Sequence, residues 1–308
     1  MHILIDIGII VACCVALAKG ADLLVESAAR IAKRIGMSQL VVGLTIVAFG
    51  TSAPEFAVTV SAALNNHADI SVANVVGSNI FNLGFILGGC AILYAIETDK
   101  YMIWRDGTIL VLITLFLIPL LSDLEISRFE GASMFALLVA YLAYLFFGKR
   151  SGEADVPEGS AQWHDVPIML VGLALIIAGG QFLVESAVEL ARFFGLSEWI
   201  IGATIIAAGT SLPELVTSLV AIHKKHSGIS AGNLIGSNIF NTLGVLGAAG
   251  MIRPLAVDAA AMESLIALSG FTVLVVIMMR TGWKLSRFEG IMLVITSLFF
   301  WIYAFAGR

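Results

Sequence analysis

Residues 48–55 read AFGTSAPE, and residues 207–214 read AAGTSLPE. A second shared stretch follows each of them, because GSNIFN occupies both 77–82 and 236–241. The offset is 159 residues in both cases. Each copy places a glutamate directly after a proline in a strongly apolar stretch, and this pattern decides how the rest of the chain is interpreted.

The repetition extends beyond these motifs. A gapless alignment of 42–88 with 201–247 holds 22 identities in 47 positions. Chance does not produce such agreement at one fixed offset, so the chain contains an internal duplication. We expect one repeat over 1–150, a short linker over 151–163 and a second repeat over 164–308.

The composition is typical of an integral membrane protein. Hydrophobic residues make up 59% of the chain, charged residues 13%, and the mean hydropathy is +0.99. A soluble domain is closer to half apolar and a quarter charged. Apolar stretches long enough to cross a bilayer are predicted near 3–30, 40–64, 71–95, 107–122, 129–147, 167–190, 199–222, 230–253, 260–280 and 288–306.

The predicted fold is an all-α membrane protein with ten transmembrane helices. Because each half holds five spans, the second half enters the membrane from the opposite side, which gives two inverted-topology repeats. Lys and Arg agree with this arrangement: loops on one side hold 12 of them, and loops on the other side hold four. By the positive-inside rule both termini lie outside, and the expected location is the cell membrane.

Two glutamates lie in the middle of predicted spans. Glu55 belongs to the second span and Glu214 to the seventh. A carboxylate at this depth costs several kcal/mol and usually faces a bundle interior, a cavity or an ion. The alternative is a buried, protonated acid with a structural hydrogen bond, which would have to occur twice at equivalent positions.

A helix breaker precedes each glutamate. Pro54 lacks an amide hydrogen, and together with Gly50 it predicts a break that frees carbonyl oxygens from Ala48 to Thr51. Pro213 and Gly209 predict the same in the seventh span. Irregular backbone at membrane depth persists only where it is buried in protein or lines a cavity. We therefore expect the second and seventh helices to be broken around an internal site.

Polar residues form a stripe in the spans that follow. Asn74, Ser78 and Asn82 are spaced to share one helix face, and Asn233, Ser237 and Asn241 repeat the pattern. The stripe could contribute to the site or could join helices by hydrogen bonds, as the neighbouring Gly77 and Gly236 would allow. The second interpretation applies mainly to Asn74 and Asn233, which lie nearer the helix ends.

The oxygen atoms at this depth predict a hard cation as ligand. Carboxylates, hydroxyls, amide carbonyls and main-chain carbonyls suit Ca²⁺ and Na⁺, whereas no mid-membrane His or Cys pattern suits a softer metal. We interpret Cys13, Cys14 and Cys90 as small core residues. The segments that carry the ion site are predicted to be 43–88 and 202–247.

For the other charged residues the sequence predicts ordinary structural or interfacial roles. Lys19 and Asp22 lie three residues apart in the first span, which predicts an ion pair within that helix. Glu26 and Glu185 repeat near helix ends, where an interfacial position is the default. His67 and His226 also repeat, in short loops, and a solvated or interfacial role is expected for both.

The paired motifs resemble the α-repeats of the cation/Ca²⁺ antiporter superfamily, and specifically its prokaryotic-type sodium/calcium exchangers. The resemblance covers the whole length, and it implies that the first and sixth helices slide across the site as gates. It also implies a ligand set made of Glu55, Glu214, Thr51, Ser52, Thr210, Ser211, Ser78, Ser237, Asn82, Asn241 and the backbone carbonyls of Ala48 and Ala207. Asn82 and Asn241 match positions that carry an aspartate in some relatives, so a third carboxylate is missing.

The expected function is secondary active antiport of Na⁺ against Ca²⁺ by alternating access, with the two ions competing for one site built on two glutamates. The nearest alternative is an H⁺/Ca²⁺ antiporter of the same superfamily, and a cation channel is an alternative of a different class. We expect no enzyme activity, since no hydrolase, metalloprotease or phosphate-binding motif is present. The expected partners are the two ions and the lipid bilayer, with no cofactor, nucleic acid or protein partner.

Overall fold

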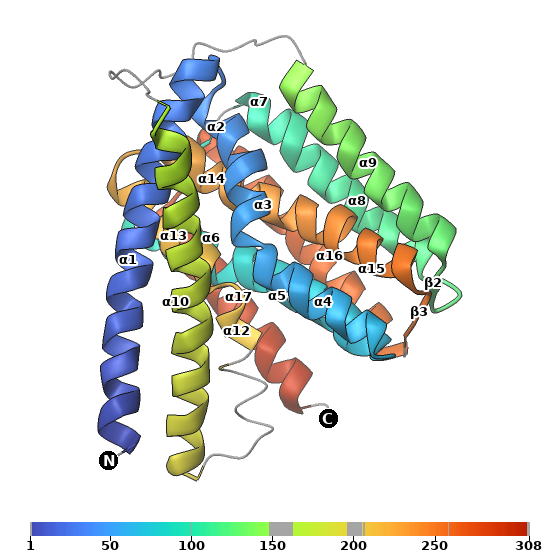
Figure 1. Cartoon of the computed structure of the whole chain (residues 1–308). Coiled ribbons are helices and arrows are strands. Elements are labelled where there is room, and N and C mark those ends of the chain that lie inside the picture. The colour runs from blue at the N-terminus through green and yellow to red at the C-terminus, as the bar shows by residue number, and fades with distance from the viewer. Residues whose placement is uncertain are drawn as a thin grey trace.

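The computed structural model describes residues 2–98, 100–147, 163–195, 205, 207–257 and 259–306. This part of the chain is predominantly helical (Figure 1). It contains seven helices long and apolar enough to cross a membrane, and a bent pair of helices makes an eighth. The chain is therefore a multi-pass membrane protein. The predicted linker, apart from Trp163, and the start of the seventh predicted span lie outside the described residues.

The first half follows the predicted order of helices. Its described elements are α1 (His2–Ile35), α2 (Gln39–Val42), η1 (Gly43–Val47), α3 (Ala48–Thr51), α4 (Ala53–Leu64), α5 (Ala68–Phe81), η2 (Asn82–Ile86), α6 (Leu87–Leu93), β1 (Ile96–Glu97), α7 (Lys100–Met102), η3 (Ile103–Gly107), α8 (Thr108–Leu120), β2 (Glu125–Ile126) and α9 (Arg128–Phe147). Segments η1, η2 and η3 are π-helical turns inside longer helices.

The second half repeats much of this order. Its described elements are α10 (Asp165–Phe193), α12 (Ala207–Gly209), α13 (Leu212–His223), α14 (Ser227–Ile239), η5 (Phe240–Val245), α15 (Leu246–Ile252), β3 (Leu255–Ala256), α16 (Ala259–Arg280), η6 (Thr281–Trp283), β4 (Lys284–Leu285) and α17 (Arg287–Ala306). Segment η5 is again π-helical, at the position that matches η2.

Two helix bounds differ from the sequence prediction because charged residues continue the helices beyond their apolar cores. The first predicted span, 3–30, extends to Ile35, and Lys33 and Arg34 lie in its last turn, where a positive charge favours a helix C-terminus. The fourth, 107–122, begins as early as Lys100.

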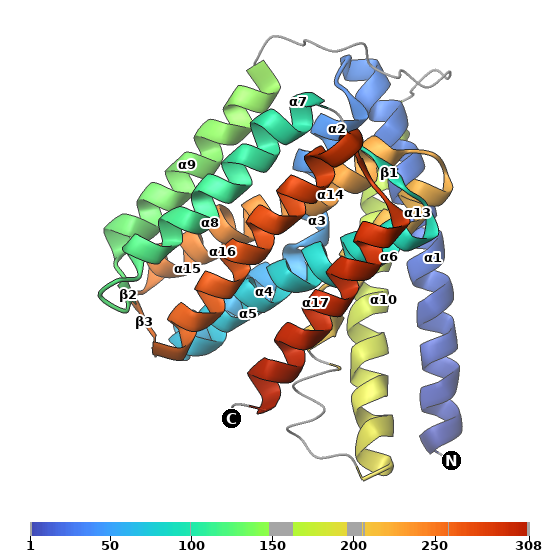
Figure 2. The same ribbon diagram turned by 180° about the vertical axis from the view of Figure 1, so that it is seen from behind.

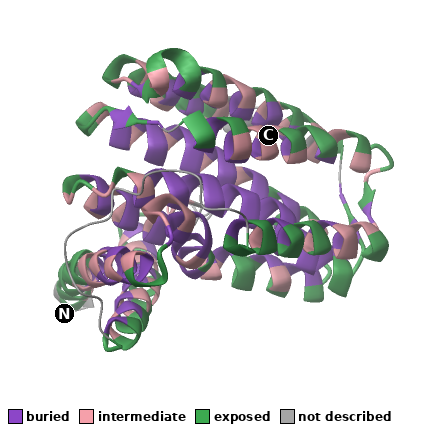
Figure 3. Ribbon diagram, turned by 90° about the horizontal axis from the view of Figure 1, so that it is seen from above, coloured by how far each residue is buried: buried purple, intermediate pink, exposed green. Residues whose placement is uncertain are grey.

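The most buried helices form the centre of the bundle, and the most exposed ones surround it. In an apolar 18-residue window of each span, 89% of the residues are buried in Ser227–Ile252 and 72% in Ala68–Leu93, but only 28% in α1 and 22% in α10. Viewed from above, buried residues accordingly concentrate in the middle of the molecule (Figure 3). The central helices are also the ones that carry the polar stripes, so their polar side chains face protein and not lipid.

Helices α1 and α10 form a long pair at one side of the bundle, which both side views show (Figures 1 and 2). A Cβ atom on Gly20 would lie 2.7 Å from the carbonyl oxygen of Gly172, and a Cβ on Gly172 would lie 2.7 Å from that of Gly20. Each helix therefore needs glycine at this crossing so that the two backbones can touch.

The two halves interlock through contacts that occur at matching positions. Gly88 of α6 packs against Gly290 of α17, and Gly247 of α15 packs against Gly131 of α9. Gly88 and Gly247 are equivalent positions 159 residues apart, and so are Gly131 and Gly290, so the two contacts are counterparts of each other. Short antiparallel ladders also join the halves, since β1 pairs with β4 and β2 pairs with β3. These cross-half contacts hold the two repeated motifs together at the centre.

Candidate cation site

The second span is broken where the sequence predicts it. Helices α3 and α4 meet at a bend of 49°. Ser52 stands between them with φ −82° and ψ 12°, and Ser211 stands between α12 and α13 with φ −91° and ψ 9°. The prolines follow in the first turns of α4 and α13, where their missing amide hydrogen is tolerated.

The breaks place both glutamates in the first turn of a new helix. Glu55 lies in the first turn of α4, and Glu214 lies in the first turn of α13. Both side chains are completely buried. The unpaired amides and the dipole of a helix N-terminus favour negative charge at this position. Breaking the span at mid-depth therefore creates local stabilisation for a carboxylate that an uninterrupted helix would lack.

Reciprocal hydrogen bonds join the two motifs. Ser52 Oγ donates to Oε1 of Glu214 at 2.9 Å, and Ser211 Oγ donates to Oε1 of Glu55 at 2.9 Å. Ser237 Oγ lies 3.4 Å from the same Oε1 of Glu214. Each carboxyl group thus depends on a hydroxyl from the other half of the chain, so the two repeats build a single polar centre.

Six of the twelve predicted ligand residues have a buried side-chain oxygen that takes part in no hydrogen bond with another described residue. Within the described part of the chain, buried oxygens with no hydrogen-bond partner include Oε2 of Glu55, Oε2 of Glu214, Oγ of Ser78, Oγ1 of Thr210 and Oδ1 of both Asn82 and Asn241. A buried polar atom left without a partner costs about 1–3 kcal/mol. An oxygen-only set of this kind matches the coordination preference of a hard cation.

The other predicted residues have partners. Thr51 Oγ1 donates to Oδ1 of Asn233 at 3.1 Å, and Asn233 Nδ2 donates to Ser218 Oγ at 3.1 Å. Asn74 Nδ2 donates to Thr59 Oγ1 at 2.9 Å, which is the matching contact of the first half. Asn74 and Asn233 therefore join neighbouring helices by hydrogen bonds, as one interpretation of the stripe anticipated.

The backbone at Ala48 differs from the expectation of freed carbonyls. Its oxygen accepts the amide of Ser52 at 3.1 Å and lies 3.4 Å from Thr51 Oγ1. The chain stays helical up to the break, because Pro54 removes only the amide that would have bonded the carbonyl of Gly50. Ala207 is the first residue of α12, next to undescribed residues, and the structure does not describe its side chain.

Sequence reasoning missed two buried asparagines. Asn79 and Asn238 lie in the same GSNIFN motifs but outside the predicted stripe, and both are fully buried. Asn79 Nδ2 donates to Thr242 Oγ1 at 2.9 Å, across the interface between the halves. Their repetition at the fixed offset of 159 residues could have identified them, because Ser78 and Ser237 beside them repeat in the same way.

A cavity of about 1190 Å³ extends to the two helix breaks beside this centre. Pro54, Thr210 and Pro213 line it on the side of the two motifs. Most of its remaining lining comes from α4, α10 and the turn after α4, and includes Asn65, His67, Gln181, Glu185, Glu189 and Arg192. The cavity therefore connects the breaks with the ends of α4 and α10.

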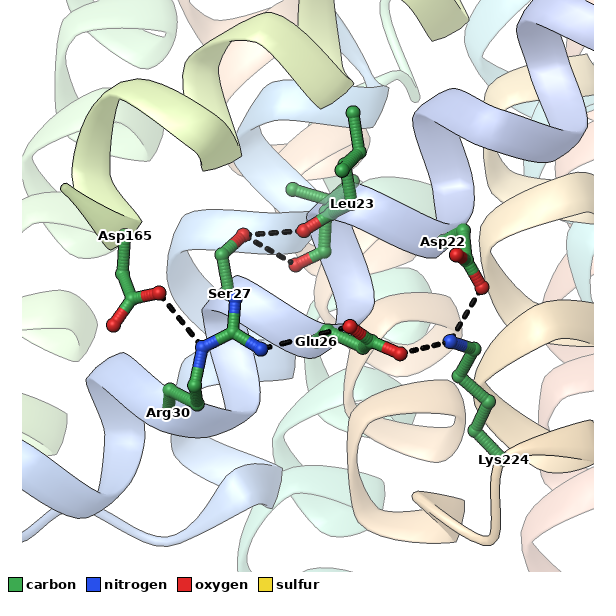
Figure 4. A network of polar contacts seen from close by, with 8 residues as sticks. Asp22, Leu23, Glu26, Ser27, Arg30, Asp165 and Lys224 are labelled. Atoms are coloured by element: carbon green, nitrogen blue, oxygen red, sulfur yellow. Dashed lines mark hydrogen bonds and ion pairs between the residues drawn. The ribbon is translucent and has the colours of Figure 1, made fainter. Parts of the chain in front are cut away.

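Ion pairs join α1 to its neighbours at the opposite end of the bundle (Figure 4). Lys224, directly after α13, pairs with Asp22 and Glu26 of α1. Arg30 pairs with Asp165 at 2.7 Å and with Glu26 at 3.5 Å. The predicted pair between Lys19 and Asp22 is therefore wrong: the lysine that reaches Asp22 comes from the other half of the chain, a contact that spacing within α1 cannot reveal.

Two titratable groups next to this network have shifted pKa values. Partial burial lowers the pKa of His226, and the nearby charge of Lys224 lowers it further. Partial burial also opposes the charge of Lys224, but its hydrogen bonds to Asp22 and Glu26 outweigh this and raise the pKa of the lysine. Lys224 therefore stays charged, whereas His226 favours its neutral form.

Comparison with known proteins places the chain in a family. The profile of the "Sodium/calcium exchanger protein" family matches it twice, over residues 5–147 and 164–306. This chain belongs to the sodium/calcium exchanger family. The resemblance drawn from the paired motifs is thereby confirmed.

Named relatives of this sodium/calcium exchanger family protein cover nearly its whole length. It is 38% identical to the putative antiporter CaxA of Alkalimonas amylolytica, over 90% of this chain and 92% of the relative. It is 31% identical to the sodium/calcium exchanger MaX1 of Methanosarcina acetivorans, over 94% and 95% of the two chains.

A solved structure of the sodium-calcium exchanger NCX_Mj, soaked with zero Na⁺ and Ca²⁺, superposes on this exchanger family member with a TM-score of 0.86. The two chains are 28% identical, and the match covers 99% of each. Within its described residues, this family member has no group of three or more His, Cys, Asp or Glu that could hold a metal. The acidic part of its centre consists of the two glutamates, with amides at 82 and 241.

Proposed function

We propose that this protein is a secondary active antiporter that exchanges Na⁺ for Ca²⁺ across the membrane by alternating access. The observation that carries the proposal is the buried centre in which Glu55 and Glu214 are joined by Ser52 and Ser211 and surrounded by oxygens without partners. Both ions would compete for this centre. Family membership supports the same conclusion, since named relatives are called exchangers and antiporters.

The two glutamates would enforce exchange in place of a leak. When both are ionised and the site is empty, two negative charges lie in a medium of low dielectric, which strongly disfavours passage between the two access states. One Ca²⁺, or two or more Na⁺, would neutralise them. Only loaded forms would then cross efficiently, so movement of one ion in one direction would require return of the other.

The proposed ligand set divides into three kinds of oxygen. The carboxyl groups of Glu55 and Glu214 provide the charge. Hydroxyl and amide oxygens complete the shell, and those proposed are Thr51, Ser52, Ser78, Asn82, Thr210, Ser211, Ser237 and Asn241. The backbone carbonyls of Ala48 and Ala207 are proposed as further Na⁺ ligands; a carbonyl oxygen has two lone pairs, so Ala48 can bind an ion as well as the amide of Ser52.

We propose that α1 and α10 are the elements that move. They pack mainly on each other, with a close backbone crossing at Gly20 and Gly172, and they are among the least buried of the long helices. The cavity opens beside α10 at one end, whereas ion pairs tie α1 to Lys224 at the other. This combination supports a conformation that is open at one end and closed at the other.

The proposed topology is two inverted five-helix repeats, 1–150 and 164–308, with both termini outside the cell membrane. Two features support it. The family profile matches each half separately. Contacts such as the Ser52–Glu214 and Ser211–Glu55 hydrogen bonds recur at positions 159 residues apart.

Ion-gradient experiments with the purified protein in proteoliposomes test the proposal. Vesicles are loaded with Na⁺, diluted into Na⁺-free buffer that contains Ca²⁺, and Ca²⁺ uptake is followed at a fixed pH with the membrane potential clamped. We expect rapid uptake that depends on the outward Na⁺ gradient. An outward H⁺ gradient or K⁺ gradient of the same size, imposed alone, is expected to drive little uptake.

Each alternative has its own outcome in the same experiment. Uptake driven by the H⁺ gradient and indifferent to Na⁺ would indicate an H⁺/Ca²⁺ antiporter. Uptake down a Ca²⁺ gradient with no counter-ion would indicate a channel. Glu125→Gln serves as the matched control for charge loss, because Glu125 is exposed in the short strand β2, and it should transport like the parent protein.

A further inference from the structure

Asn79 joins the two halves through three hydrogen bonds at the centre of the bundle. Its Nδ2 donates to Thr242 Oγ1 at 2.9 Å and to the backbone carbonyl of Asn238 at 3.4 Å. Its Oδ1 accepts a hydrogen bond of 3.2 Å from Nδ2 of Asn241. All of these residues are fully buried, so no bulk water competes for these groups.

These contacts determine which way both amides face. The backbone carbonyl of Asn238 can only accept, so the Asn79 side chain must turn its NH₂ group toward it. The oxygen of Asn79 then faces Asn241, and an oxygen can be satisfied there only by the NH₂ group of Asn241. As a result Oδ1 of Asn241 points away from Asn79, and it has no hydrogen-bond partner among the described residues.

The matching residues of the other half do not form this chain of contacts. Asn238 corresponds to Asn79, but its Nδ2 donates to the carbonyl of Leu234 in its own helix at 2.6 Å. Asn82 corresponds to Asn241, and neither its nitrogen nor its oxygen has a partner in the described structure. The sequence supplies a reason, because the position that matches Thr242 is Leu83, which offers no hydroxyl to attract the amide.

We propose that Asn79 is a positioning residue that fixes Asn241 with its carbonyl oxygen toward the cation site. The inference rests on the proposed function, because it assigns Asn241 as a ligand of the transported ion. Asn241 lies one turn after Ser237, whose hydroxyl reaches Glu214. If its amide were reversed, an NH₂ group would face the ion instead, and a cation is repelled by such a donor.

The first test removes the contacts of Asn79. Asn79→Leu keeps the approximate volume and removes both the acceptor and the donors. We expect the Ca²⁺ concentration for half-maximal Na⁺-driven uptake to rise by about 10- to 100-fold, the usual effect of losing a residue that orients a ligand, with a smaller change in maximal rate. Thr242→Val is a second variant, which removes only the hydroxyl that holds Asn79 and preserves shape.

A double variant separates positioning from general damage to the fold. In Asn241→Asp both terminal atoms are oxygens, so reversing the side chain changes nothing that the ion contacts. Adding Asn79→Leu to this background should therefore change the half-maximal Ca²⁺ concentration by less than about threefold, because no ligand orientation is left to lose. A merely structural role for Asn79 would give the same loss in both backgrounds, and that result would overturn the proposal.

The matched control is Asn238→Leu. Asn238 is equally buried, is also asparagine and belongs to the same motif, but no side-chain contact joins it to Asn82 in the described structure. We expect a much smaller effect than in Asn79→Leu. Equal effects, or an unchanged half-maximal Ca²⁺ concentration in both Asn79→Leu and Thr242→Val, would refute the positioning role. Failure of the parent protein to show Na⁺-driven Ca²⁺ uptake would instead refute the proposed function.

Discussion

Ser52, in the first repeat, donates a hydrogen bond of 2.9 Å to Glu214, in the second. The Ser211–Glu55 contact has the same length, so neither carboxyl group is held by its own motif alone. A polar centre assembled in this way forms only when the two halves are correctly packed. This dependence links the stability of the bundle to the geometry of the proposed ion site.

The reciprocal hydrogen bonds predict equal effects of two distant substitutions. Ser52→Ala and Ser211→Ala should each raise the Ca²⁺ concentration for half-maximal uptake by about 2- to 10-fold, the equivalent of one hydrogen bond to a ligand. Uptake assays on reconstituted protein measure this. Ser133→Ala, in which an exposed hydroxyl of α9 is lost, is the control and should have no effect. A large effect of only one of the two would contradict their equivalence.

The ion pairs of Lys224 predict a shift in the conformational equilibrium. Position 65 of the first half matches Lys224, and it holds Asn65, which lines the cavity. Lys224→Asn removes the ion pairs with α1 and should weaken closure at that end of the bundle. Asn65→Lys should strengthen closure at the cavity end, because the new lysine would attract Glu185. Both would favour the conformation in which the cavity is closed. Because these charges are partly exposed, we expect a change of only about two- to fivefold.

Labelling of an introduced, accessible cysteine measures this shift, since the native Cys13 and Cys90 are buried. Ser61 lines the cavity, so Ser61→Cys in a Cys14→Ser background should react with a water-soluble thiol reagent. The reaction should be slower in both Lys224→Asn and Asn65→Lys. Lys225→Asn is the matched control, since Lys225 is exposed and no ion pair joins it to another described residue. Unchanged rates in both variants would show that the ion pairs do not influence access.

Neighbouring glycines of α6 predict opposite changes in stability. A Cβ on Gly88 would lie 2.9 Å from the carbonyl oxygen of Gly290, whereas a Cβ on Gly89 would meet nothing within 4 Å. Gly88→Ala should therefore destabilise the fold by about 1–3 kcal/mol. Gly89→Ala should stabilise it by about 0.5–1 kcal/mol, because alanine favours a helix over glycine. Thermal unfolding in detergent compares them, and equal melting temperatures would contradict the close α6–α17 packing.

His226 predicts a loss of stability in acid. Its pKa is lowered in the folded protein by burial and by Lys224, so the unfolded chain binds more protons as the pH falls below about 6.5. Stability should be fully present above this value and decline through the interval down to the lowered pKa. His226→Gln should remove this part of the decline, whereas His223→Gln, at an exposed position, should keep it. Identical pH profiles for the parent and His226→Gln would contradict the assignment.

The sequence was sufficient to predict the helical membrane class and the candidate residues of the centre. Charged residues are so unfavourable in lipid that the glutamates repeated at 55 and 214 strongly predict a site inside the helix bundle. The break before each glutamate was predictable as well, because a proline lacks the amide hydrogen needed to continue the helix in which it lies. The duplication then provided a second, independent copy of every signal.

Contacts between distant segments could not be predicted in the same way. Spacing within α1 suggested that Lys19 pairs with Asp22, but Lys224 approaches from the other half. The contacts of Asn79 depend on where Thr242 and Asn241 lie after the halves pack. The π-helical turns, such as η2 beside Asn82, likewise have no local sequence signal that distinguishes them from ordinary helix.

A titration of Ca²⁺ into the purified protein, with and without Na⁺, tests the central claim most directly. We predict saturable Ca²⁺ binding by calorimetry, an apparent affinity that falls steadily as Na⁺ is raised, and no detectable binding to folded Glu55→Gln or Glu214→Gln, with Glu125→Gln binding like the parent protein. Ca²⁺ binding that persists in both glutamine variants, or that does not respond to Na⁺, would contradict a shared site built on the two glutamates.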